Sequence, residues 1–109
     1  MTINEMVEQA HGMAMEKGWW DEDRGVGEAI ALMHSELSEA LEEARNGHSP
    51  ELVYYERFSD KPEGVGVELA DCVIRIADFC GRHKIDLEHI IEMKMKYNAT
   101  RPTKHGKVF

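Results

Sequence analysis

Four carboxylates stand in two pairs with the same spacing, Glu36 with Glu39 and Glu68 with Asp71. On a helical wheel each pair falls beside the apolar stripe of its own helix, at nearly the same angle. If the two stripes pack together, the four side chains converge, and cations must neutralise them. Oxygen ligands suit hard cations, so the pattern predicts a Mg²⁺ site in which Mn²⁺ could substitute.

Two other interpretations of these carboxylates stay open at the level of sequence. Acidic residues three positions apart are common on solvated helix faces, so either pair alone favours plain surface charge. A di-iron bundle would need a Glu-x-x-His spacing on two helices. Only Glu8 and His11 show that spacing on the long helices, which disfavours the iron site.

Apolar residues recur at helical spacing in four segments, and these must position the carboxylates. The predicted helices cover 3–17 and 26–45, a third capped by Asp60 with Pro62 and Glu63 in its first turn and ending near His83, and a fourth capped by Asp86 and ending near Ala99. Residues 48–61 read as a loop with a short helical turn. Strand-like alternation is scarce, so we expect an all-α bundle of about four main helices.

The composition limits the classes of protein this chain can be. Its 109 residues fit a single domain, 1–109, with a modest core that oligomerisation would help to bury. A net charge of −8 argues against non-specific nucleic-acid binding and against an anionic membrane surface. We find neither a secretory signal nor a membrane span in the sequence, and we expect a cytoplasmic protein. Cys72 and Cys80 lie about 12 Å apart on one predicted helix, which indicates buried reduced thiols.

Aromatic and basic residues near the end of the first helix suggest a ligand contact. Trp19 and Trp20 are candidates for stacking on a base, although at least one could instead plug the end of the bundle. Lys17 could reach a phosphate or cap the helix. Near the end of the fourth helix, Lys94, Asn98 and Arg101 share one face, which by itself could serve only to complement the helix dipole.

The ExxE…ExxD signature of the MazG-like, all-α nucleoside triphosphate pyrophosphohydrolases resembles two segments here, ELSE at 36–39 and ELAD at 68–71. The family's KxxxNxxR segment resembles KMKYNATR at 94–101, which a proline follows. Some relatives carry a further Glu immediately before the first motif, where this chain has Ser35. This departure leaves the number of metal ions and the water-activating base open.

The resemblance implies an activity and a role for each matching residue. The family cleaves nucleoside triphosphates between the α- and β-phosphates, giving the monophosphate and pyrophosphate. Glu36, Glu39, Glu68 and Asp71 would be the metal ligands. The resemblance does not identify the water-activating base; our own candidates for the catalytic residues are Glu36 and Glu39, with Glu39 orienting the water. Lys94, Asn98 and Arg101 would contact phosphate or sugar.

The resemblance also implies self-association, as a homodimer or a homotetramer with bundles completed between subunits. The basic tail, 103–109, is expected to be irregular, and its end, 105–109, either to fold over the substrate or to fray. Two rival functions remain at this stage. One is a sensor that binds nucleotide and Mg²⁺ without hydrolysing it, and the other is a helical regulatory module.

Overall fold

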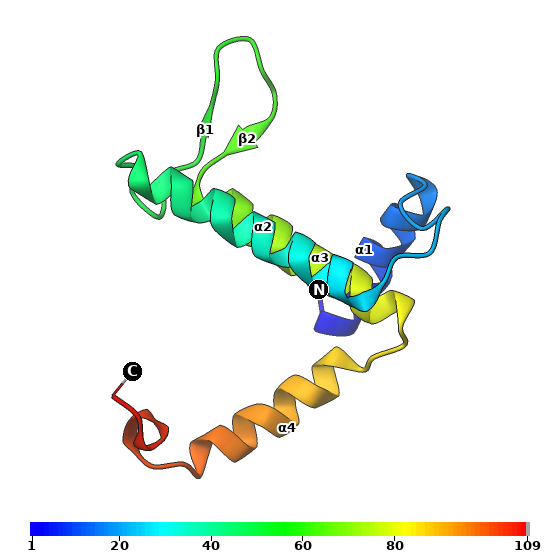
Figure 1. Ribbon diagram of the computed structural model, residues 1–109, viewed down its shortest axis with the longest axis vertical. Coiled ribbons are helices and arrows are strands. Elements are labelled where there is room, and N and C mark those ends of the chain that lie inside the picture. Colours follow the sequence, from blue (N-terminus) through cyan, green and yellow to red (C-terminus); the bar gives the residue numbers. More distant parts are fainter. Residues whose placement is uncertain (109) are drawn as a thin grey trace.

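The computed structural model describes residues 1–108 and shows a mainly helical chain (Figure 1). The elements are α1 (Ile3–Glu16), α2 (Val26–Arg45), β1 (Tyr54–Tyr55), β2 (Pro62–Glu63), α3 (Val65–Arg82), α4 (Leu87–Ala99) and a short 3₁₀ helix, η1 (Thr103–Gly106). Four main helices were predicted, and the ends of α1, α2 and α4 agree with that prediction to within a residue. The tail contains η1 and is not wholly irregular, while Phe109 lies outside the described residues.

Local hydrogen bonds set both ends of α1. Thr2 and Glu5 form a capping box, in which each backbone N–H donates to the other's side-chain oxygen at 3.0 Å. Gly18 then takes a left-handed conformation with φ of 80°, and the Trp19 N–H donates to the carbonyl of Ala14 at 3.0 Å. The turn holds Trp19 directly beside the end of α1.

The predicted start of the third helix at Asp60 is wrong. Pro62 and Glu63 instead form β2, which pairs antiparallel with β1, and α3 begins only after Gly64. Proline suits an edge strand as well as a first helical turn, and Tyr54 and Tyr55 are favourable strand residues. The same two strands make the all-α expectation incomplete.

A carboxylate on α2 anchors this hairpin. The hydroxyl of Tyr54 lies 2.9 Å from both Glu43 carboxylate oxygens, and His48 shares the same carboxylate. Bonding to His48 is the main cause that holds the pKa of Glu43 below its ordinary value. The hairpin therefore connects the end of α2 to the start of α3 through a fixed contact.

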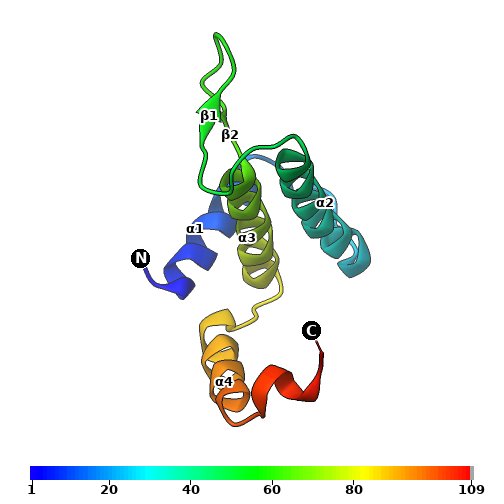
Figure 2. The same ribbon diagram turned by 90° about the vertical axis from the view of Figure 1, so that its left-hand side faces the viewer.

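Helix α3 is the centre of the fold, with α2 on one side and α1 on the other (Figures 1 and 2). Val7 of α1 packs against Ala77 and Cys80 of α3 in a small core. Both Cys72 and Cys80 are buried, as expected, and both are free thiols. Helix α4 joins this core only at its beginning, where the Ile3 N–H donates to Glu88 at 3.1 Å.

The contact of α2 with α3 uses only part of the apolar stripe predicted for α2, which comprised Ile30, Met33, Leu37, Ala40, Leu41 and Ala44. The buried residues of α2 are Ala29, Glu36 and Ala40, whereas Leu37 and Leu41 are exposed. Small alanines let the two helices approach closely, and this turns the leucines away from α3. Ala40 of the predicted stripe is therefore buried, whereas its leucines are exposed.

Apolar side chains remain uncovered along much of the chain. Exposed residues include Ile30, Leu37 and Leu41 on α2 and Leu69 and Val73 on α3. All of α4 is described, and none of its residues is buried. The radius of gyration is 16.5 Å, above the roughly 13 Å typical of this length. Within residues 1–108, no helix has the length and apolar character needed to cross a membrane.

Gly64 offers a test of the hairpin-to-α3 junction. Its φ is 141°, and an added Cβ would lie 2.2 Å from the carbonyl oxygen of Leu52. We expect Gly64→Ala to lower the free energy of unfolding by roughly 2–4 kcal/mol in urea titrations. The matched control is Gly27→Ala within α2, where an added Cβ has open space, and this change should stabilise by up to about 1 kcal/mol. Equal stability of the two variants would contradict the tight junction.

Candidate functional site

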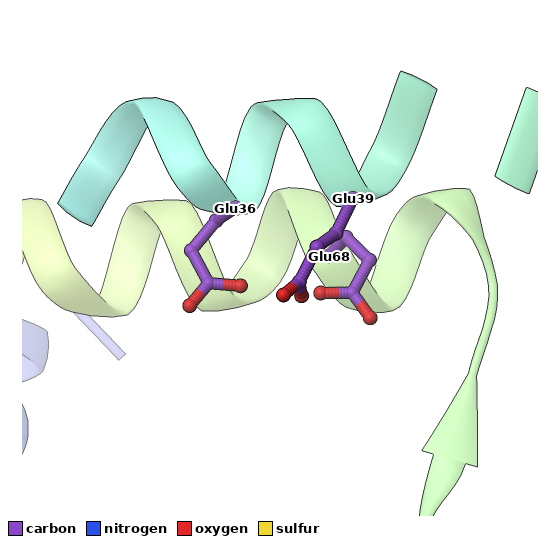
Figure 3. Close-up of side chains that lie close together, drawn as sticks. All are labelled: Glu36, Glu39 and Glu68. Carbon is purple, nitrogen blue, oxygen red and sulfur yellow. The ribbon is translucent and has the colours of Figure 1, made fainter. Parts of the chain in front are cut away.

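Three of the four predicted carboxylates meet between α2 and α3. One oxygen from each of Glu36, Glu39 and Glu68 lies within 4.8 Å of the others. Figure 3 shows all three side chains on the same side of the helix pair. Glu36 and Glu68 are buried, whereas Glu39 is exposed. We call these three residues the acidic cluster. Their arrangement offers oxygen ligands to a cation, and their role as metal ligands stays a prediction.

Glu68 is the member of the acidic cluster that most needs a partner. It is 8% exposed, and its Oε2 has no hydrogen-bond partner among the described residues. Burial, followed by hydrogen bonding to Glu39 and the negative charge there, raises the pKa of Glu68 from 4.5 to about 7. A buried carboxylate without a partner is unfavourable, so this oxygen needs a proton or a cation.

Asp71, the fourth predicted ligand, lies one turn further along α3 and outside that group of three. Burial is the largest cause that raises its pKa, followed by the negative charge of Glu36. The guanidinium of Arg75 acts in the opposite direction. Asp71 is therefore electrostatically part of the same site, although it does not share the closest grouping.

A pocket of about 350 Å³ adjoins the acidic cluster. It is within the usual size range of small-molecule sites, near the lower end. Glu36 belongs to both the cluster and the pocket wall, so the two features are continuous. The wall combines apolar residues with charged ones: Ala10, Met13, Ala14, Trp19 and Ile74, then Lys17, Glu36, Asp71, Arg75 and Asp78.

Lys17 and Trp19, both predicted to contact the substrate, lie in the wall of this pocket. The Arg75 guanidinium lies 5.2 Å from the centre of the Trp19 ring. Trp19 is also 46% exposed, so its ring remains accessible. The structure thus brings two predicted substrate residues beside Glu36 and Asp71.

Trp20 has a different position from its neighbour. It is 7% exposed, and its indole N–H donates to Asp78 Oδ1 at 2.9 Å. The rings of His11 and His83 pack edge-on against it. The structure therefore does not support the predicted stacking of Trp20 on a base. Trp20 is the tryptophan that fills the interior.

Two residues of this site were not chosen from the sequence, Arg75 and Asp78. The Arg75 Nε donates to Glu36 Oε1 at 2.8 Å, and Asp78 Oδ1 is shared by Trp20 and His11, each at 2.9 Å. Both residues lie on the same side of the α3 wheel as Asp71. That placement was the signal in the sequence that could have found them.

The predicted contacts from the end of α4 are not brought to the acidic cluster within one chain. None of the described residues that line the pocket beside the acidic cluster comes from α4. Lys94 and Arg101 instead lie near the Tyr97 ring, at 4.9 and 5.7 Å from its centre. Asn98 has a buried Oδ1 without a hydrogen-bond partner in the described part of the chain. These three residues remain a separate group.

Comparisons with known proteins leave the family of this chain open. No family model matches it, and no match was found among curated proteins or solved structures. A function has to be argued from the residues of the site, because a helical fold alone is compatible with many activities.

The pKa of Glu68 predicts how stability depends on pH. Because the folded state raises this pKa from 4.5 to about 7, the folded protein holds the proton more tightly. Its free energy of unfolding should then fall as pH rises across that interval. Glu68→Gln removes this contribution, so its melting temperature relative to wild type should be higher at pH 8 than at pH 5, in buffer with a chelator. The exposed Glu42→Gln is the control, and a parallel response of both variants would refute the assignment.

Proposed function

We propose that this chain is a Mg²⁺-dependent nucleoside triphosphate pyrophosphohydrolase of the MazG-like kind. It would cleave a (deoxy)nucleoside triphosphate between the α- and β-phosphates, releasing the monophosphate and pyrophosphate. The observation that supports the proposal is the acidic cluster, which contains the unpartnered Glu68 oxygen and shares Glu36 with a pocket lined by Lys17 and Trp19.

The residues of the acidic cluster fit a hard divalent cation. They offer only oxygen ligands, and Glu68 Oε2 lacks any other partner among the described residues. Glu36, Glu39, Glu68 and Asp71 are the proposed ligands. When bound, Mg²⁺ would stabilise charge on the attacked phosphoryl group and lower the pKa of a coordinated water. A polyanionic substrate also becomes compatible with this acidic surface only once cations neutralise it.

Glu39 is the best candidate for orienting the attacking water. It is the exposed member of the acidic cluster, so water can reach it. Glu36 is less free, because one of its oxygens accepts from Arg75. Glu36 would then act mainly as a ligand with a fixed orientation, and Glu39 as the base-like residue.

The pocket can hold the nucleoside end of the substrate. Its apolar wall and the accessible Trp19 ring suit a flat base, and stacking would supply affinity with little base selectivity. Lys17 would contact a phosphate from the pocket edge. In this arrangement the polyphosphate would lie across Glu36 and Asp71, beside the other carboxylates.

Self-association is part of the proposal because the single chain leaves apolar surface uncovered. On a helical wheel, Leu37 lies about 100° beyond the buried Glu36 of α2. Leu69 lies about 100° beyond the buried Glu68 of α3, in the same sense of rotation. Helices α2 and α3 run antiparallel (Figure 1), so the same rotation points to the same side of the pair. We infer that the exposed Leu37, Leu41, Leu69 and Val73 share one face. A second copy could cover that face, giving a homodimer or homotetramer. Lys94, Asn98 and Arg101 could then approach a neighbouring subunit's site.

The activity itself is tested by product analysis. Purified protein is incubated with each dNTP and Mg²⁺, and the products are separated. We expect monophosphate and pyrophosphate, with turnover lost on chelation. Glu68→Gln should reduce kcat/KM by at least about a thousandfold without unfolding the chain, and Glu42→Gln should leave it unchanged. Binding without turnover would support a nucleotide sensor, and a fully active Glu68→Gln would refute the metal site.

The shared apolar face is tested by measuring molar mass in solution. Leu41 is 60% exposed, and Leu41→Glu would place a charge in the proposed contact. We expect light scattering to show at least a dimer for wild type and a smaller species for this variant. Met15→Glu, at an exposed position on α1, should keep the wild-type mass. A monomeric wild type would refute self-association.

A further inference from the structure

Arg75 lies where the acidic cluster and the pocket meet. Its side chain is 24% exposed, and its Nε donates to Glu36 Oε1 at 2.8 Å. The guanidinium carbon lies 5.2 Å from the centre of the Trp19 ring, and Arg75 is itself a pocket residue. A carboxylate and an aromatic ring thus hold its guanidinium in place.

Most of the hydrogen-bonding capacity of this guanidinium is unused. An arginine has five N–H donors, of which the Glu36 contact takes only the one on Nε. Among the described residues, the terminal nitrogens of Arg75 have no hydrogen-bond partner. Four donors are therefore available in a pocket that otherwise contains Lys17 as its only described cationic side chain.

We propose that Arg75 binds a phosphate group of the substrate through its terminal nitrogens while its Nε keeps hold of Glu36. This inference rests on the proposed function and adds a residue that the matched motifs do not contain. Two terminal N–H groups match two oxygens of one phosphate. Glu36 would connect the metal site with the phosphate contact, because it belongs to the acidic cluster and also accepts the hydrogen bond from Arg75.

The charges around the pocket favour this role. Glu36, Asp71 and Asp78 make the wall acidic, so a polyphosphate needs fixed positive groups near it. Arg75 is positioned before the ligand arrives, so little rotamer freedom is lost on binding. A lysine at this position could supply charge, but it could not bond to Glu36 and a phosphate with the same planar fork.

The rival explanation is that Arg75 only positions Glu36. The two explanations predict different affinities for a ligand that consists of phosphate groups alone. Inorganic pyrophosphate makes no base contact, so its affinity in the presence of Mg²⁺ reports the phosphate contacts without requiring turnover. A purely positioning Arg75 would instead act through Glu36, so its loss would lower kcat and Mg²⁺ affinity but leave pyrophosphate affinity at saturating Mg²⁺ near wild type.

The experiment compares Arg75→Gln and Arg75→Lys with wild type by calorimetric titration of pyrophosphate with saturating Mg²⁺ present, alongside steady-state kinetics. Loss of charge-assisted bonds to phosphate should weaken pyrophosphate binding about 10- to 100-fold in Arg75→Gln, with a matching loss in kcat/KM. Arg75→Lys should recover part of that affinity. The control is Arg45→Gln, an exposed arginine paired with Glu42 on α2, which should match wild type.

Each result decides between the explanations. Unchanged pyrophosphate affinity in Arg75→Gln, in a variant with wild-type melting temperature, overturns the phosphate contact and leaves the proposed activity standing. Wild-type protein that binds no pyrophosphate also overturns it. Arginine-dependent pyrophosphate binding without any turnover of nucleotides would support the contact and reject the proposed hydrolase. If Arg75→Gln does not fold, Arg75→Lys carries the comparison.

Discussion

The close approach of α2 and α3 is the constraint on which the site depends. Ala29 and Ala40 leave room for it, and the same contact buries Glu36 and Glu68. Burying two carboxylates beside each other is unfavourable unless protons or cations compensate. The raised pKa of Glu68 and the bond from Arg75 to Glu36 are two partial compensations within the chain. A divalent cation would be a more complete one.

The rest of the fold holds this contact and builds a pocket against it. The left-handed turn at Gly18 sets Trp19 beside the end of α1, while Trp20 is fixed inside by Asp78. At the other end, Tyr54 and Glu43 fasten the hairpin to α2. Helix α1 and the hairpin therefore brace opposite ends of the α2–α3 pair, and the pocket forms where α1 meets α3.

Three features of the single chain are consistent with a missing partner surface. Helix α4 touches the core only at its beginning, and one side of the α2–α3 pair presents leucines to solvent. Lys94 and Arg101, at and just after the end of α4, also lie apart from the acidic cluster. One cause, the absence of a neighbouring subunit, would account for all three features, which is why self-association belongs with the proposed activity.

The sequence by itself determined the helices and the two carboxylate pairs, because periodicity and spacing are local properties of the chain. It therefore predicted four main helices, and it singled out four carboxylates, of which Glu36, Glu39 and Glu68 form the closest group. Tertiary structure decided the rest. The rotation of α2, the pairing of Tyr54 with Glu63 and the bond from Arg75 to Glu36 join distant segments. Such contacts depend on how distant segments pack together, and the spacing of residues within one segment does not encode that.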